Sequence, residues 1–186
     1  MNEMALALAE DPRDGRLNGD AVVVNLVWDA AADLDLAALC VKADGHQATL
    51  VYFGMRGTRC GMPFVHLAID HDGGGRRKNR REHLVASNLS IHEAIYLFAW
   101  DHDAIDSERS GVRAAGMRQW KATLLDRYNQ GPVVDGCFDE SKNLVLFGSI
   151  KDRLFCADSQ SRLVTSRKEL LNTISSLVDV SLEVAA

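Results

Sequence analysis

The chain has 186 residues, of which 47% are hydrophobic, and a formal net charge of -5. This length suffices for one well-buried domain or two small ones, and the composition is that of an ordinary globular protein. The acidic balance argues against general affinity for nucleic acids because it repels phosphate, and no apolar run approaches the ~20 residues that a membrane helix needs.

The N-terminal part is predicted to be a lead-in segment, residues 1–19, ahead of a single domain that covers residues 20–186. Residues 1–10 lack the basic leader and cleavage pattern of a secretion signal, so we expect a cytoplasmic protein. The four cysteines form no C-x-x-C pair and are expected to be reduced thiols. Cys40 and Cys156 lie in apolar runs and are expected to fill the core.

Short apolar and β-branched runs dominate the chain and predict β-strands. In chain order they cover residues 21–28, 34–42, 49–53, 63–68, 83–87, 94–101, 119–128, 144–150 and 153–157. Asp44-Gly45 predicts a tight hairpin between the second and third runs. The run 94–101 is the most hydrophobic and is expected at the centre of a sheet. Repeated short strands separated by turn signals predict a mainly β fold with two packed sheets, a β-sandwich.

The C-terminal part changes to a helical period. Ser166-Arg-Lys-Glu169 is a capping-box pattern ahead of apolar residues at helical spacing, namely Leu170, Leu171, Ile174 and Leu177. The pattern predicts one amphipathic helix over residues 166–178. We expect this helix to cover an edge of the sandwich rather than to bind a partner.

Carboxylates gather in three clusters at the ends of predicted strands. The clusters are Asp29 with Asp33-Leu-Asp35, Asp70-His-Asp72, and Asp101-His-Asp103 with Asp106 and Glu108. Alternate residues of a strand face the same side, so each D-x-D pair directs its carboxylates together, and they repel each other unless a cation lies between them. Calcium takes about six to eight oxygen ligands of this kind. Strand ends converge in a sandwich, so the clusters can meet; solvated loop acids are the alternative for any single cluster.

The stretch from Asp70 to Glu82 reads D-H-D-G-G-G-R-R-K-N-R-R-E. It begins with the carboxylates of Asp70 and Asp72 and ends in a basic run. The cations of that run are Arg76, Arg77, Lys78, Arg80 and Arg81. One interpretation is a metal site with added charge; the alternative is an anion-binding module that holds phosphate or an acidic partner protein. Aromatic residues do not interleave with this run, which weakens a role in binding single-stranded nucleic acid.

A metal-dependent hydrolase is a third hypothesis, because histidines and carboxylates together hold metals that activate water. The candidate residues are Asp70, His71, Asp72, Asp101, His102 and Asp103. The sequence contains no nucleophile motif, P-loop or zinc-spaced His/Cys set beside them. We therefore expect a protein that is not an enzyme.

Several degenerate motifs follow one another in a characteristic order over roughly residues 20–160. They are Val27-Trp28-Asp29 followed by Asp33-Leu-Asp-Leu36, then Leu50-Val-Tyr-Phe53, Phe64-Val-His-Leu-Ala-Ile-Asp70 with the glycine-rich stretch to Glu82, Phe98-Ala-Trp-Asp-His-Asp-Ala104, and Leu144-Val-Leu-Phe-Gly-Ser149. In this order the chain resembles the tellurium-resistance TerD family of bacterial stress proteins. The resemblance implies a two-sheet β-sandwich that binds calcium and takes part in tellurite and stress responses, without an established enzymatic reaction.

The resemblance also implies protein partners of a stress-response system, no membrane insertion and a set of metal ligands. Those ligands would be Asp33, Asp35, Asp70 and Glu82, to which the second D-x-D pair adds Asp72. The family has an acid pair before the glutamate, where this chain has Arg80 and Arg81. This reversal of local charge is expected to weaken calcium binding. Either one weakened site is retained on the acids, or guanidinium groups pair with Asp33 and Asp35 in place of the metal.

Overall fold

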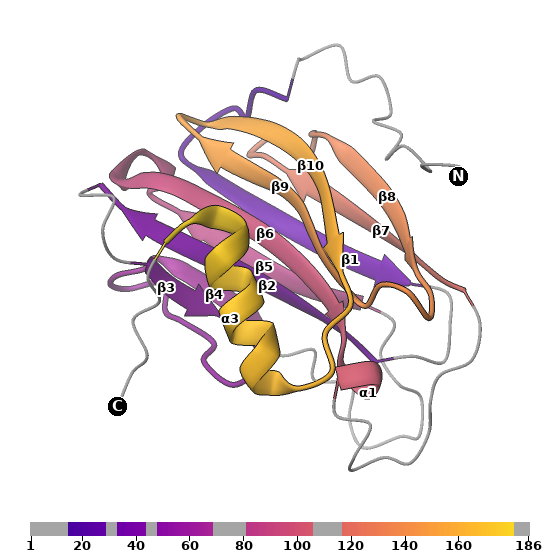
Figure 1. The fold of residues 1–186 in the computed structure, drawn as a ribbon. Helices are drawn as coiled ribbons and strands as arrows, with labels where there is room; N and C mark the ends of the chain where they lie inside the picture. Colours follow the sequence, from indigo (N-terminus) through magenta and orange to yellow (C-terminus); the bar gives the residue numbers. More distant parts are fainter. Residues whose placement is uncertain (1–14, 29–32, 44–47, 69–80, 106–116, 181–186) are drawn as a thin grey trace, which may run out of the picture.

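Two five-stranded antiparallel sheets form a β-sandwich in the computed structural model (Figure 1), which describes residues 15–28, 33–43, 48–68, 81–105 and 117–180. Sheet A has the strand order β4-β5-β1-β7-β8, and sheet B has the order β10-β9-β6-β2-β3. The mainly β, two-sheet fold expected from the strand pattern is confirmed. Among the described residues, no helix is long and apolar enough to cross a membrane.

The strands of each sheet come from both halves of the chain. Those of sheet A are β4 (Val65–Ala68), β5 (Arg81–Ser87), β1 (Ala21–Trp28), β7 (Arg118–Leu125) and β8 (Val133–Phe138). Those of sheet B are β10 (Leu154–Arg162), β9 (Leu144–Lys151), β6 (His92–Asp101), β2 (Leu34–Lys42) and β3 (Ala48–Val51). The described helices are η1 (Leu89–Ile91), α1 (His102–Ile105) and α3 (Arg167–Val178).

The main core lies between the two sheets. In β1 the side chains of Val22, Val24, Leu26 and Trp28 are buried, whereas those between them are half-buried or exposed. This period of two places one face of sheet A against sheet B and leaves the other face outward. The inner face of sheet A therefore explains the alternating sequence pattern of β1.

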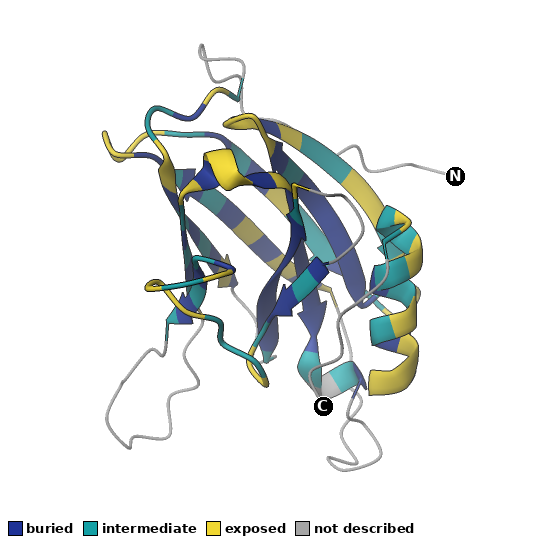
Figure 2. Ribbon diagram, turned by 90° about the vertical axis from the view of Figure 1, so that its left-hand side faces the viewer, coloured by how far each residue is buried: buried dark blue, intermediate teal, exposed yellow. Residues whose placement is uncertain are grey.

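The strands β2 and β6 of sheet B are largely buried on both faces because α3 packs on the outer side of the sheet. Leu170 and Ile174 of α3 join a second core cluster with residues of β2, β6 and β9. Every residue of β2 except Lys42 is buried, which explains its nearly continuous apolar sequence. Figure 2 shows these strands largely in dark blue, and α3 with yellow and teal on its outward side. The helix covers a sheet face, so our expectation that it covers an edge was wrong.

The bounds of α3 agree with the capping pattern. The Ser166 hydroxyl accepts a hydrogen bond from the Glu169 backbone N–H, at 3.2 Å. Glu169 reaches back one residue further than the standard box, and its Oε2 accepts from the backbone N–H and the hydroxyl of Thr165, both at 2.7 Å. The segment before the helix is fixed by Asn143, whose side chain exchanges two hydrogen bonds with the backbone of Val164.

Most predicted strands are present, and β6 lies at the centre of sheet B as expected. Strand β8 was missed because Asp135 and Gly136 interrupt its apolar pattern. Gly136 is required there, since a Cβ atom would lie 2.3 Å from the Trp120 ring. Cys40 is buried as expected, but Cys156 is exposed, so its assignment to the core was wrong. Cys156 lies on β10, which is one of the two edge strands of sheet B.

Candidate functional site

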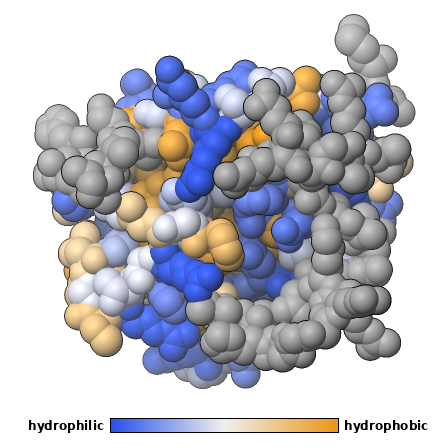
Figure 3. Space-filling model, turned by 90° about the horizontal axis from the view of Figure 1, so that it is seen from below, coloured by the Kyte–Doolittle hydropathy of each residue, from blue (hydrophilic) through white to orange (hydrophobic). Residues whose placement is uncertain are grey.

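The ends of three strands bring acidic side chains to one end of the sandwich. Strand β2 begins where β6 ends, with Asp35 opposite Trp100, and β5 begins beside the end of β1, with Glu82 opposite Leu26. Helix α1 follows β6 at this end, which is the lower end in Figure 1. Figure 3 views the molecule from below and shows hydrophilic and hydrophobic surface side by side there. The topology therefore places Asp33, Asp35 and Glu82 at the same end.

Asp35 is a buried carboxylate held by an indole and an imidazole. It is 6% exposed. Its Oδ2 accepts a hydrogen bond from Trp100 Nε1 at 2.8 Å and lies 2.9 Å from His102 Nδ1. The backbone N–H of His102 donates to the carbonyl oxygen of Asp33 at 2.8 Å, which fixes the two chain segments together. The His102 side chain is 40% exposed, so solvent reaches this pair from one side.

Glu82 approaches from sheet A and bonds to the backbone of sheet B. Its Oε2 accepts a hydrogen bond from the Leu36 N–H at 2.6 Å. The ladder between β2 and β3 begins at Ala38, so Leu36 lies beyond the last residue that β3 pairs with. Glu82 thus supplies an acceptor for a strand N–H that β3 does not reach.

The surroundings of Glu82 disfavour its charged form. The pKa of Glu82 is raised to about 8, mainly by burial and in addition by the negative charges of Asp35 and Asp33. The hydrogen bond from Leu36 and the charge of His102 oppose this shift but do not cancel it. A carboxyl group at neutral pH in such a place is either protonated or in need of a cation.

Asp101 belongs to a different arrangement on the other face of sheet B. It is fully buried, and its Oδ2 lies 2.7 Å from Arg118 Nε of β7. Its Oδ1 accepts a hydrogen bond from the Ala104 N–H at 3.0 Å. This ion pair joins sheet B to sheet A inside the sandwich. Asp101 and His102, which the hydrolase hypothesis grouped together, therefore have separate partners in the structure.

A calcium ion at this end would need carboxylate oxygens that are not already used in hydrogen bonds. Asp35 and Glu82 each commit one oxygen to an internal hydrogen bond, whereas the described part of the chain donates no hydrogen bond to the other, Asp35 Oδ1 or Glu82 Oε1. Carboxylates that are oriented through one oxygen are suited to hold a hard cation through the other. Within the described ranges, however, no group of three His, Cys, Asp or Glu side chains is arranged to hold a metal ion. Asp35 Oδ1 and Glu82 Oε1 are therefore two carboxylate oxygens at this end that accept no hydrogen bond from the described residues.

The remaining predicted site residues are mostly outside the described residues. These are the carboxylates Asp70 and Asp72 and the cations Arg76, Arg77, Lys78 and Arg80. Arg81 is described and exposed, opposite Val27 at the start of β5. The contacted oxygen of Asp35 lies against Trp100 and His102. Arg80 lies outside the described residues, so pairing of a guanidinium with Asp33 and Asp35 stays a prediction.

Trp100 and His102 were not predicted as partners of Asp35. Trp100 was assigned to a strand and His102 to a hydrolase cluster, and neither was linked to the first D-x-D pair. The signal that links them is register, because β2 and β6 run antiparallel and Asp35 lies opposite Trp100. If the register of β2 against β6 had been predicted from the sequence, it would have placed Asp35, Trp100 and His102 together.

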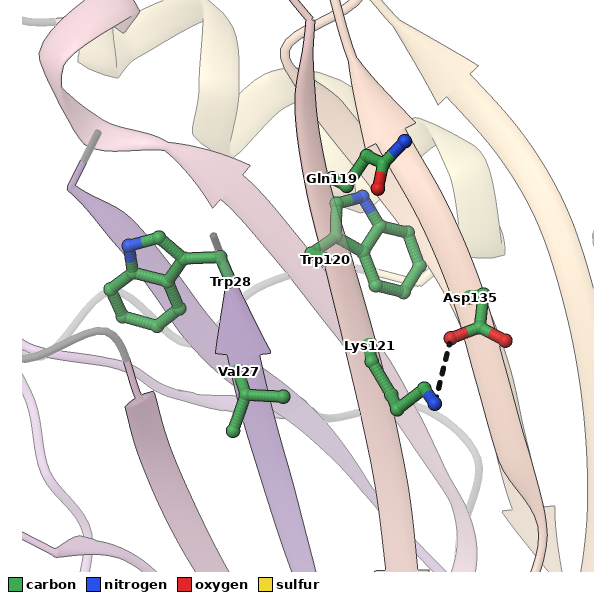
Figure 4. Close-up of a pocket in the computed structure, with 6 residues that line it drawn as sticks. All are labelled: Val27, Trp28, Gln119, Trp120, Lys121 and Asp135. Carbon is green, nitrogen blue, oxygen red and sulfur yellow. Dashed lines mark ion pairs between the residues drawn. The ribbon is translucent and has the colours of Figure 1, made fainter. Parts of the chain in front are cut away.

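A pocket of about 450 Å³ lies nearby on sheet A (Figure 4). Its lining residues are Val27, Trp28, Gln119, Trp120, Lys121 and Asp135. Lys121 Nζ and Asp135 Oδ1 lie 3.7 Å apart, so the two charged groups of the lining pair with each other. The pocket offers apolar surface and no uncompensated charge for binding or catalysis.

Comparisons with known proteins identify no relative. A scan against protein-family models gave no match, and searches of curated proteins and of solved structures gave none either.

Proposed function

We propose that this chain is a cytoplasmic, non-enzymatic stress-response protein of the TerD type that binds calcium weakly at its acidic end. The order of sequence motifs supports the resemblance to tellurium-resistance proteins, and a two-sheet sandwich is the fold that this resemblance implies. The observation that carries the calcium proposal is the convergence of Asp33, Asp35 and Glu82 from both sheets.

Electrostatics gives the physical reason for a cation at this end. The negative charges of Asp33 and Asp35 act on the buried Glu82 and raise its pKa. A divalent cation between these groups would offset both the repulsion and the burial of charge. Asp70 and Asp72 would complete the oxygen set, while the arginines that follow them in sequence would reduce its affinity.

Thermal unfolding with calcium and with chelator tests the proposal. A ligand at 100 times its Kd adds about 2.7 kcal/mol to the free energy of unfolding. For a domain of this size that corresponds to a Tm increase of roughly 5–10 °C. We expect this increase at calcium concentrations about 100 times the Kd, a smaller one with magnesium at the same concentration, and none in Asp35→Asn, which keeps an acceptor for Trp100.

The matched control is Glu93→Gln. Glu93 is an exposed acid near the start of β6, at the opposite end of the strand from Asp101. This variant should retain the full calcium response. Equal Tm values in calcium and chelator for the wild-type protein would refute calcium binding and would leave the fold unaffected.

A further inference from the structure

A tight turn after β3 presents an exposed phenylalanine. Tyr52 and Met55 exchange two backbone hydrogen bonds, each of 2.9 Å, so Phe53 and Gly54 form the tip of the turn. The Phe53 side chain is 57% exposed. An exposed ring at the tip of a turn gains little from burial, so its stabilising contribution to the fold is small.

Two arginines lie against the aromatic rings of this turn. The guanidinium carbon of Arg56 lies 5.2 Å from the centroid of the Phe53 ring. That of Arg167, at the start of α3, lies 5.5 Å from the Tyr52 ring, and Arg167 Nη2 donates to the Tyr52 hydroxyl at 2.8 Å. Gly54 makes room for this contact, because a Cβ there would lie 2.8 Å from Arg167 Nη2.

Acids among the described residues do not neutralise these two guanidinium groups. In that part of the chain, His102, Arg118 and Lys121 lie within 4 Å of carboxylates, whereas Arg56 and Arg167 instead lie against the Phe53 and Tyr52 rings. The chain nevertheless has an excess of acids, with a net charge of -5. Contact with a ring holds each guanidinium in place and leaves N–H donors for an external anion.

We propose that Tyr52, Phe53, Arg56 and Arg167, the aromatic–arginine patch, bind single-stranded nucleic acid. An exposed ring beside cations is a combination that holds single strands, because bases stack on the ring and phosphates pair with the cations. In this patch Phe53 is the exposed ring, whereas Tyr52 is half-buried against the second core cluster. Arg59 and Lys168 are exposed and follow closely in sequence, which adds positive charge beside the patch. The inference is independent of the calcium proposal.

The experiment measures fluorescence anisotropy of a labelled 12-nucleotide oligo(dT) and oligo(rU) with the full chain, in chelator. We expect a Kd of about 10⁻⁴ to 10⁻⁶ M at physiological salt. The plot of log affinity against log salt concentration should have a slope of about -1.4 for two phosphate contacts. Phe53→Ala should weaken binding about tenfold, and Arg56→Ser with Arg167→Ser should flatten the salt dependence.

Two further variants keep the test specific. Phe53→Leu retains an apolar side chain but removes the ring, so it should bind as poorly as Phe53→Ala. Arg127→Ser removes an arginine in the turn after β7 whose guanidinium carbon lies 4.7 Å from the centroid of the Tyr128 ring. This matched control should bind as the wild-type protein does.

The proposal is overturned if neither oligonucleotide binds, if Phe53→Leu binds as tightly as the wild-type protein, or if Arg127→Ser has the same effect as the patch variants. Binding of a labelled poly-glutamate peptide in place of the oligonucleotides would also overturn it and would assign the patch to an acidic protein partner. Far-UV circular dichroism of each variant confirms that the sandwich remains folded.

Discussion

The acidic end predicts an unusual dependence of stability on pH, which Glu82→Gln should remove. The folded-state pKa of Glu82 is raised from 4.5 to about 8. A carboxyl group whose pKa is higher in the folded state stabilises the fold fully below the unfolded value, and this contribution is lost as pH rises towards the folded value. In the absence of cations, the wild-type protein should therefore become less stable between pH 4.5 and 8.

The magnitude follows from the shift. In the unfolded chain Glu82 has a pKa of 4.5, so at pH 7, about 2.5 pH units higher, it is ionised. Folding must then either protonate this side chain or bury its charge. At about 1.36 kcal/mol per pH unit, this lowers the free energy of unfolding by about 3 kcal/mol. Glutamine has the same shape and keeps an acceptor for the Leu36 N–H. The Glu82→Gln variant should thus be more stable than the wild-type protein by on the order of 3 kcal/mol at pH 7 in chelator.

Urea unfolding at pH 5 and pH 8 in chelator measures this difference. We expect the wild-type free energy of unfolding to fall by several kcal/mol relative to that of Glu82→Gln over this range. Glu93→Gln should follow the wild-type curve. Parallel curves for the wild-type protein and Glu82→Gln would refute the electrostatic reasoning.

Three further predictions concern the framework of the fold. Asp126 accepts hydrogen bonds from its own turn and from Asn18, which outweigh its burial and lower its pKa to about 2. Asp126→Ala should therefore lower the free energy of unfolding in urea by about 1–3 kcal/mol. In the wild-type protein this contribution should be lost as pH falls from 3.8 towards 2. Asn143→Ala should destabilise by about 1–3 kcal/mol and raise hydrogen exchange in α3, because the two bonds to the segment before the helix are lost; unchanged exchange in α3 would contradict this role. Arg118→Met should cost about 3–5 kcal/mol by leaving the Asp101 charge buried, and Asp101→Leu in the same chain should restore much of the loss in thermal unfolding; additive losses would contradict the pairing.

Sequence periodicity predicted those strands and helices whose residues are determined by local burial and capping alone. Strand β2 is apolar apart from Asp35 and Lys42 because both of its faces are buried, and α3 has a capping box and a helical period. Strand β8 was missed because its glycine serves the neighbouring Trp120 ring, a contact that lies outside the local pattern. The position of α3 on a sheet face rather than an edge depends on tertiary packing alone.

The acids of the candidate site were predicted from the sequence, whereas their partners were not. The acids of the first D-x-D pair and Glu82 stand out in the sequence, and the structure places them at one end of the sandwich. Their partners depend on pairing between strands that are distant in sequence, as Trp100 and His102 are from Asp35. Likewise, Arg167 and Tyr52 are 115 positions apart in the sequence, so the aromatic–arginine patch could not be predicted from local sequence patterns.

Isothermal titration of calcium in two buffers of different ionisation enthalpy tests the central claim most directly. At pH 7, a carboxyl group with a pKa of about 8 is mostly protonated, so calcium that binds at the acidic end must displace its proton. We predict saturable binding that releases about 0.9 proton per calcium ion in the wild-type protein, and no such release in Glu82→Gln. Absence of binding heat in both buffers, or binding heat that is the same in both, would contradict the proposed site.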